Sequence, residues 1–183
     1  MKSTTLVLAA LGIVALSVPL NAQFAATKAG SGAESKDRYA GKWFRLKTQF
    51  TGPGQCLEGN RRGGSEKNGN AYMTPCQDVS GQLWKLERQP DGNYRLKTQF
   101  RGEGECLEGN SAGKGAFMDK CQNVTGQLWR ITPAGNGYVR LQNLMGDNSL
   151  EGNRSDLPGA GGAAFMDTKQ DVTGQLWKLT EAK

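Results

Sequence analysis

The sequence repeats itself three times, and this repetition restricts the chain to folds assembled from three similar units. A Gly-Gln-Leu-Trp block recurs at intervals of roughly 45 residues, a period typical of repeat architectures. Three further blocks precede it in every copy: one ending in Arg-Leu, one reading Leu-Glu-Gly-Asn and one reading Ala-aromatic-Met. The four blocks lie at residues 44–46, 57–60, 71–73 and 81–84, at 94–96, 107–110, 116–118 and 126–129, and at 139–141, 150–153, 164–166 and 174–177.

The pattern within the blocks predicts β-strands. Each block alternates apolar and polar residues and is followed by a stretch rich in Gly, Asn or Asp, which is typical of short strands joined by turns. Four strands in each of three copies predict an all-β domain at residues 41–183, with repeats at about 42–88, 92–133 and 137–181. The domain should be closed or nearly closed, because open sheet edges invite aggregation.

The N-terminal residues differ from the rest of the chain. A positive Lys2, an apolar run from Leu6 to Val18 and a small Ala22 predict a signal peptide at residues 1–22, too short to span a membrane. Residues 23–40 are rich in Ala, Gly, Ser and Lys, which predicts a flexible segment. We therefore expect a secreted or periplasmic protein without stable membrane insertion after processing. In such a compartment disulfides are expected.

The repeats also indicate how the cysteines pair. Two cysteines lie in the first copy and two in the second, whereas the equivalent positions of the third copy are Ser149 and Lys169. Both members of the pair are missing together, as expected for residues that bond to each other. The predicted disulfides are Cys56–Cys76 and Cys106–Cys121.

The chain contains no histidine. This excludes Ser-His-Asp and Cys-His catalysis and every histidine-ligated metal site, and the cysteines lack the C-x-x-C spacing of a zinc site. We therefore expect no enzymatic activity, no metal and no cofactor.

The formal net charge of +6 is spread thinly, and Arg61-Arg62 is the one adjacent basic pair after the leader. No basic stripe of the kind that binds nucleic acid is present.

Units of this length, carrying Cys-Leu-acidic near their start and ending in Gln-x-Trp, resemble the ricin B-type lectins over residues 42–181. The resemblance implies a β-trefoil, in which three four-stranded lobes surround a pseudo-threefold axis. The apolar residues that flank each Trp independently predict that it lies in the shared core, and each motif glutamine is expected to satisfy backbone groups of a turn. These structural residues are Trp84, Trp129, Trp177, Gln82, Gln127 and Gln175.

The same resemblance points to a sugar site in each lobe. Lectins of this family hold galactose with an Asp two residues after the first cysteine, an aromatic residue two before the second, and an Asn before the motif glutamine. This chain keeps an acidic residue at the first position but has no aromatic residue at the second and glycine at the third. Strand alternation offers a replacement ring on the same face, two residues earlier. The predicted carbohydrate-binding residues are Glu58, Asn60 and Tyr72, then Glu108, Asn110, Phe117 and Asp119, then Glu151, Asn153, Phe165 and Asp167.

The sequence is compatible with two structural interpretations of these residues. In the first, an exposed ring covers the apolar face of a sugar while the carboxylate and amide bind its hydroxyl groups. In the second, the rings pack into the barrel or its cap, and Glu-Gly-Asn simply forms a turn.

Two functions follow. The first is a secreted, non-catalytic lectin-like module, expected to be monomeric, with up to three weak sites for glycans or polysaccharide, for example on a cell surface. The alternative is a protein-binding trefoil without sugar binding, such as an inhibitor of extracellular hydrolases. It would act through the loops at residues 61–70 or 154–162.

Overall fold

The computed structural model describes residues 37–59, 69–109, 115–152 and 162–183. The predicted signal peptide and most of the predicted flexible segment lie outside these residues. Within them, every repeat forms the four strands that its four blocks predict, and one short additional strand, β3 (Gly69–Asn70), precedes the third block of repeat one. The strands of repeat one are β1 (Trp43–Thr48), β2 (Gln55–Glu58), β4 (Tyr72–Pro75) and β5 (Trp84–Arg88).

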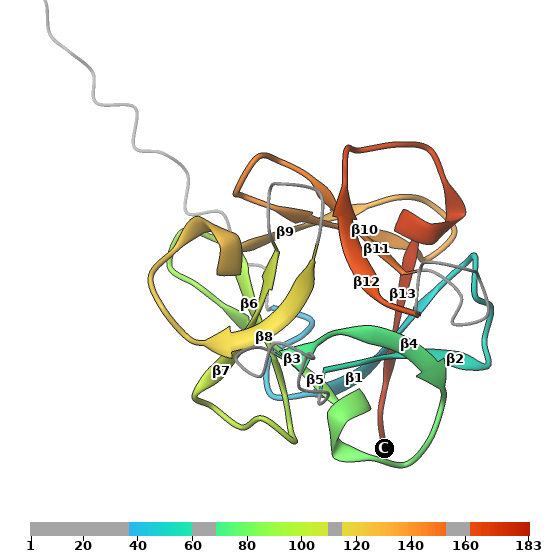
Figure 1. The fold of residues 1–183 in the computed structure, drawn as a ribbon, viewed down its shortest axis with the longest axis horizontal. Helices are drawn as coiled ribbons and strands as arrows, with labels where there is room; N and C mark the ends of the chain where they lie inside the picture. The colour runs from blue at the N-terminus through green and yellow to red at the C-terminus, as the bar shows by residue number, and fades with distance from the viewer. Residues whose placement is uncertain (1–36, 60–68, 110–114, 153–161) are drawn as a thin grey trace, which may run out of the picture. The chain divides into compact units, whose positions relative to one another are not determined.

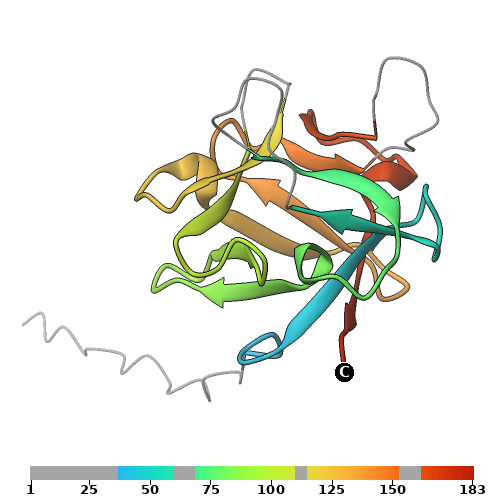
Figure 2. The same cartoon turned by 60° about the horizontal axis from the view of Figure 1, so that its bottom comes forward.

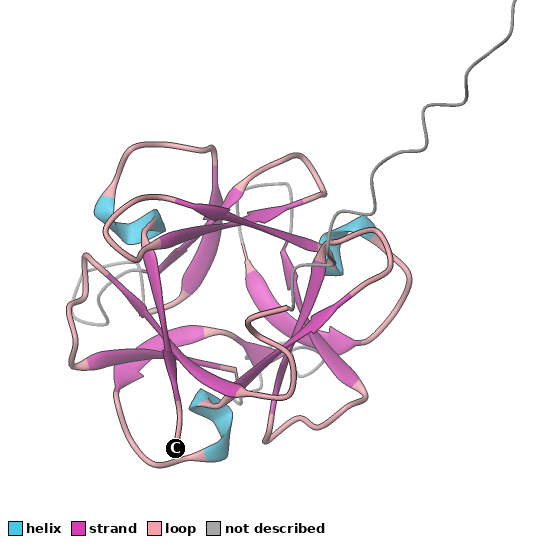
Figure 3. Cartoon of the chain, turned by 180° about the vertical axis from the view of Figure 1, so that it is seen from behind, coloured by secondary structure: helices cyan, strands magenta, loops and turns pink. Residues whose placement is uncertain are grey.

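Repeats two and three follow the same order. Repeat two contains β6 (Tyr94–Thr98), β7 (Glu105–Gly109), β8 (Ala116–Lys120) and β9 (Trp129–Pro133). Repeat three contains β10 (Val139–Asn143), β11 (Ser149–Gly152), β12 (Ala164–Asp167) and β13 (Trp177–Glu181). A single 3-10 turn precedes the last strand of each repeat: η1 (Ser80–Gln82), η2 (Thr125–Gln127) and η3 (Thr173–Gln175). Figure 3 shows these three turns at the periphery of the three lobes.

The first and last strands of the repeats form a closed barrel. Antiparallel pairing runs from β10 to β13, β1, β5, β6 and β9 and returns to β10, so no strand of this ring has a free edge. In β1 the buried positions alternate with partly exposed ones, as the sequence pattern predicts. Closure removes the exposed sheet edges that would otherwise pair with other chains.

The middle strands form three hairpins that lie against one end of the barrel (Figures 1 and 2). These hairpins are β2–β4, β7–β8 and β11–β12. Neighbouring hairpins are joined through the alanines of the Ala-aromatic-Met blocks. The Ala71 amide donates to the Ala116 carbonyl, and the Ala164 amide donates to the Ala71 carbonyl, both at 2.8 Å. All three alanines are buried, so a small side chain is required where the hairpins meet.

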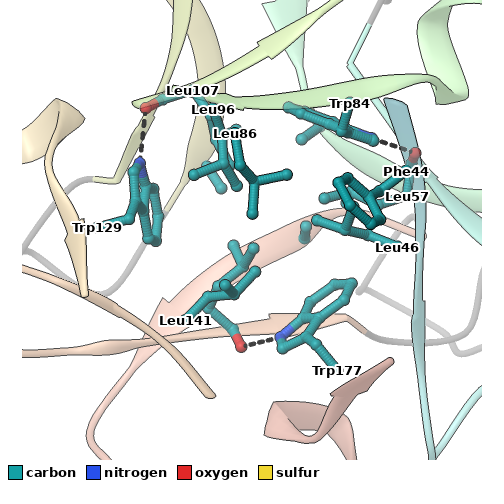
Figure 4. Packing of buried hydrophobic residues seen from close by; sticks show 14 of the residues in the cluster. Phe44, Leu46, Leu57, Trp84, Leu86, Leu96, Leu107, Trp129, Leu141 and Trp177 are labelled. Atoms are coloured by element: carbon teal, nitrogen blue, oxygen red, sulfur yellow. Dashed lines mark hydrogen bonds between the residues drawn. The ribbon is translucent and has the colours of Figure 1, made fainter. Parts of the chain in front are cut away.

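The three motif tryptophans are fully buried in one shared core (Figure 4). Each indole N–H donates to the carbonyl of the leucine in the Leu-Glu-Gly block of its own repeat: Trp84 to Leu57, Trp129 to Leu107 and Trp177 to Leu150, at 2.8, 3.0 and 2.8 Å. The indole therefore buries its large apolar surface without leaving its polar group unpaired.

The structured domain begins earlier than the sequence predicts. Tyr39, which the sequence assigns to the flexible segment, is 6% exposed and belongs to the core cluster. Its ring meets Phe44 and Tyr94 edge-to-face, with centroids 5.6 and 5.5 Å apart. The Tyr94 hydroxyl also donates to Asp37 at 3.1 Å. One aromatic residue in a polar stretch carries no periodic signal, which explains why the sequence does not predict this boundary.

Among the described residues, no helix has the length and apolar character needed to cross a membrane.

Candidate functional site

The Leu-Glu-Gly block connects the barrel core to the candidate site. Its glycine allows the backbone to lie close against the ring of the motif tryptophan. A Cβ added at Gly59 would lie 2.7 Å from Cη2 of Trp84, and one at Gly152 would lie 2.8 Å from Cη2 of Trp177. Any side chain here would push the tryptophan out of its position. The glycine is therefore required by packing, and the preceding glutamate is held at a fixed distance from the core.

The motif glutamine occupies the space between the hairpin and the 3-10 turn and uses its whole amide. In repeat one, Oε1 of Gln82 accepts from the backbone N–H of Gln77 at 2.8 Å, and Nε2 donates to the carbonyl of Pro75 at 3.0 Å. Gln127 and Gln175 make the equivalent backbone bonds in repeats two and three. All three glutamines are fully buried. They satisfy backbone groups of a turn, as the sequence predicts.

The second Nε2 hydrogen of each glutamine goes to the candidate glutamate of the same repeat. Oε2 of Glu58, Glu108 and Glu151 accepts this bond at 3.0, 2.9 and 3.2 Å. The bond fixes the direction of the carboxylate but uses one of its two oxygens, and a carboxylate can accept about four hydrogen bonds. This contact was not foreseen from the sequence, although the occurrence of both residues in all three copies is a signal that could have suggested it.

The three glutamates differ in their exposure. Glu58 is 7% exposed, whereas Glu108 and Glu151 are half-buried. Burial raises the pKa of Glu151 above its ordinary value; the hydrogen bond from Gln175 opposes this shift, and the nearby charge of Asp167 adds to it. The acidic groups of repeats two and three are thus the more accessible ones.

The predicted rings lie directly across the hairpin from these glutamates. Strand register pairs Glu58 with Tyr72, Glu108 with Phe117 and Glu151 with Phe165. Residues opposite each other in an antiparallel pair present their side chains on the same face. The methionines that follow the rings are buried and the rings themselves are half-buried. The rings are thus neither enclosed in the barrel nor fully exposed, and each lies beside its carboxylate.

The residue two positions after each ring occupies the same face of the strand. Asp119 and Asp167 take this place in repeats two and three, while repeat one has the neutral Thr74. Asp119 accepts from the backbone N–H of Lys120 at 2.8 Å, and Asp167 accepts from that of Thr168 at 2.7 Å. Two lobes therefore offer a ring with two acidic groups on the same face of the hairpin, and one lobe offers a ring with a single, more buried acid. The predicted Asn60, Asn110 and Asn153 lie outside the described residues.

The glycine before the motif glutamine explains why an acidic side chain with one more methylene fits. A Cβ at Gly174 would lie 2.9 Å from Cγ and 3.0 Å from Oε1 of Glu151, and a Cβ at Gly126 would lie 3.2 Å from Cγ of Glu108. The longer acid fills the space that a side chain at this position would need. Glutamate at one position and glycine at the other are therefore a matched pair.

In two of the three hairpins a disulfide links the first strand to the end of the second. Cys56 is bonded to Cys76 and Cys106 to Cys121, the pairs predicted from the repeats. The two disulfides are compatible with an extracellular or periplasmic protein. Among the described residues, no three His, Cys, Asp or Glu side chains gather into a group that could hold a metal ion.

The comparisons with known proteins identify the fold. No protein-family model and no curated protein matches the chain. Solved structures do match. A designed threefold-symmetric protein, ThreeFoil, aligns with a TM-score of 0.66 and 19% identity over 76% of this chain and 99% of that chain. The BEL β-trefoil aligns with a TM-score of 0.61 and 17% identity over 78% of this chain and 94% of that chain.

A third match is a structure with a bound glycan. SeviL bound to asialo-GM1 saccharide aligns with a TM-score of 0.58 and 17% identity over 78% of this chain and 98% of that chain. At these identities the likenesses show the fold alone. The chain is a β-trefoil. A Polyporus squamosus lectin shares this fold with it, at a TM-score of 0.62 and 13% identity over 76% of this chain and 49% of that chain.

Proposed function

We propose that this protein is a secreted, non-catalytic carbohydrate-binding module with one shallow site on the hairpin of each repeat. The observation that carries the proposal is the register of the hairpins, which sets a half-buried ring directly opposite a fixed carboxylate in all three lobes. The trefoil structures similar to this chain include a lectin and a protein bound to a saccharide, which supports the same function class. The proposed ligand is a glycan or polysaccharide, for example on a cell surface, and the proposed protein is a monomer.

The chemistry of the pair suits a sugar. The ring can lie against the apolar C–H face of a pyranose, while the carboxylate accepts hydrogen bonds from its hydroxyl groups. Because the glutamine holds the carboxylate in place before binding, little side-chain freedom is lost when a hydroxyl group docks. Glu58, Glu108 and Glu151 belong to three different hairpins. They therefore do not form the closely spaced pair of carboxylates that glycoside cleavage uses.

The three sites should not bind equally. Repeats two and three combine a half-buried glutamate with a second acidic residue, Asp119 or Asp167, whereas repeat one has the buried Glu58 and Thr74. We therefore expect the sites at Phe117 and Phe165 to carry most of the affinity. Weak sites on one rigid domain gain avidity on a multivalent surface when they engage together.

The test is binding to an array of neutral, acidic and amino-sugar glycans, followed by titration of the best ligand. Replacing Phe117 and Phe165 together with alanine should reduce the retained signal strongly. Phe100→Ala is the matched control, because this phenylalanine is 55% exposed and lies outside the three candidate sites. A folded protein that binds no glycan on the array, or a double variant that binds as well as the parent, would contradict the proposal.

The alternative of a protein-binding trefoil assigns the contact to the loops at residues 61–70 and 154–162. These loops lie almost entirely outside the described residues, so that alternative stays a prediction from the sequence. Loop replacement separates the two: glycan binding should survive it, and protein binding should not.

A further inference from the structure

Two strand pairs of the barrel carry a pair of lysines at equivalent positions. In β5–β6, Lys85 lies opposite Lys97, and in β13–β1, Lys178 lies opposite Lys47. The two pairs come from the same places in the repeats, as the last and first strands on either side of a repeat junction. Two like charges directly opposite each other destabilise a sheet unless an anion lies between them.

In β5–β6 the chain supplies that anion itself. Oε1 of Glu103 lies 2.9 Å from Nζ of Lys85, and Oε2 lies 2.9 Å from Nζ of Lys97, so one carboxylate bridges both cations. Glu87 contributes a second contact to Lys97 at 2.6 Å. The hydrogen bonds from the two lysines lower the pKa of Glu103 to about 2. This arrangement shows what such a lysine pair binds: a carboxylate with both oxygens engaged.

In β13–β1 the bridging acid is missing. The loop that carries Glu103 at the first junction, residues 99–104, and the equivalent loop here, residues 49–54, have the same backbone hydrogen bond and turn glycine. Gly52 and Gly102 both have positive φ, at 74° and 68°, and the carbonyls of Gly54 and Gly104 accept from the second cysteine of their repeat at 2.9 Å. Pro53 stands where the other junction has Glu103, and Thr180 stands where it has Glu87. Among the described residues, neither Lys47 nor Lys178 forms an ion pair.

A cavity of about 430 Å³ occupies this place. The two lysines form part of its wall together with Gln49, Pro53, Tyr138 and Thr180. Nζ of Lys178 lies 6.0 Å from the centroid of the Tyr138 ring. Cavities that hold small ligands begin at about 300 Å³. The wall thus offers two cations, an aromatic face, and amide and hydroxyl groups within a space large enough for a single sugar ring.

We propose that this cavity binds the carboxylate of a sugar acid. The carboxylate lies between Lys47 and Lys178, as the Glu103 side chain lies between Lys97 and Lys85. The Tyr138 ring covers the body of the ligand, and Gln49 and Thr180 bind its hydroxyl groups. The site is formed by barrel strands β1 and β13 and the loops beside them. It is distinct from the ring-and-glutamate sites on the hairpins, so it does not depend on them for binding.

The third junction carries a related solution. Arg130 of β9 lies opposite Gln142 of β10, and Arg130 pairs with Asp147 at 3.1 Å. At this junction Gln142 stands where the other two junctions have a lysine, and the remaining cation, Arg130, forms an ion pair with Asp147. Of the three equivalent places, the β13–β1 pair alone combines two cations without an acid among the described residues. The proposed site is therefore single rather than threefold.

The experiment is an NMR titration of the full protein with galacturonate, using galactose and sulfate as reference probes. Galacturonate should shift the signals of Lys47, Lys178 and Tyr138 saturably, and galactose should not. Pro53→Glu places the missing carboxylate in the cavity, so this variant should fold normally and lose binding. Lys178→Gln removes one charge-assisted hydrogen bond and should weaken binding about tenfold or more. Val124→Glu adds the same charge at an exposed position elsewhere and should leave binding unchanged.

The outcomes separate the sources of the ligand. Tighter binding of an oligogalacturonate than of the monomer identifies a uronate within a polysaccharide, and binding of the monomer alone identifies a free sugar acid; both support the site. The proposal is overturned if galacturonate gives no saturable shift, if Pro53→Glu binds as tightly as the parent, or if sulfate binds equally well. None of these results depends on whether Phe117 and Phe165 bind a glycan.

Discussion

Repeats one and two differ from repeat three in what fastens their hairpins. The first two carry a disulfide, whereas repeat three has Ser149 and Lys169 at the equivalent positions. The hydroxyl of Ser149 is buried and has no hydrogen-bond partner within the described part of the chain. Even so, β11 and β12 pair in the same register as the hairpins of the other repeats, and Trp177 is as deeply buried as Trp84 and Trp129.

The contacts that all three lobes share must therefore be sufficient for a lobe to fold. Each lobe keeps the indole bond to a leucine carbonyl, the glycine beneath the indole, and the glutamine that joins the turn to the glutamate. The disulfide is an addition that stabilises a lobe already specified by these contacts. The candidate ring and acid belong to the shared set, so the proposed site does not need the disulfide either.

The largest effect should come from breaking the shared set. Trp177→Ala and Trp129→Ala each remove a fully buried indole and leave a large cavity, which should lower the free energy of unfolding by about 3–5 kcal/mol. The cost should be similar in both lobes, because the surroundings of the two rings are equivalent. Urea unfolding followed by circular dichroism measures it. A much smaller loss in either lobe would show that the indole is not what specifies that lobe.

The sequence predicted this shared set better than it predicted the site. The repeats predicted the strands and the buried tryptophans, because packing demands the same residue in every copy. They predicted the cysteine pairs for a different reason, since both cysteines are missing together from repeat three. The bond from Gln127 to Glu108 was not foreseen, since it joins residues whose proximity depends on the three-dimensional path of the turn. The cavity lined by Lys47 and Lys178 could not be predicted from the sequence, because it forms only where two repeats meet across a sheet.

The second prediction removes the feature that repeat three lacks. Replacing Cys106 and Cys121 with serine should lower the free energy of unfolding by about 3 kcal/mol, because the crosslink no longer restricts the unfolded chain. The same change at Cys56 and Cys76 should cost about as much, since the loop it closes is of similar length. Thermal unfolding checks both variants. Loss of the native near-ultraviolet spectrum in either variant would contradict the conclusion that a lobe folds without its crosslink.

The converse change adds a crosslink to repeat three. Ser149→Cys with Lys169→Cys should form a disulfide and raise the midpoint of unfolding under oxidising conditions, and the gain should disappear under reducing conditions. Ser149→Ala is the matched control; it removes an unpaired buried hydroxyl and should be close to neutral. Failure of the two cysteines to bond would mean that the backbone of repeat three has diverged from that of the others.

A smaller effect is expected from the glutamine that links scaffold and site. Gln175→Leu keeps the volume but leaves the carbonyl of Thr168 and the amide of Gln170 without their partner, which should cost about 1–3 kcal/mol. The same change at Gln127 should cost a similar amount in the lobe with a disulfide. Each change also frees the neighbouring glutamate. Glycan binding by that lobe should therefore weaken more than the loss of stability alone accounts for, which titration at low temperature would reveal.

The smallest expected effect separates two acids of repeats two and three by the sign of their pH dependence. Burial raises the pKa of Glu151 above its usual 4.5, so its favourable contribution to stability is present below its unfolded pKa and is lost as the pH rises through the folded pKa. Glu103, with its pKa lowered to about 2, behaves in the opposite way: its stabilisation is present above its unfolded pKa and is lost as the pH falls towards 2. Glu151→Gln should therefore stabilise the protein at pH 7 and become neutral in acid, whereas Glu103→Gln should destabilise it at pH 7. Unfolding midpoints measured from pH 3 to pH 7 distinguish the two variants. A Glu151→Gln variant that is less stable than the parent at pH 7 would contradict the prediction. It would show that the hydrogen bond from Gln175, rather than burial, dominates at the Glu151 carboxylate.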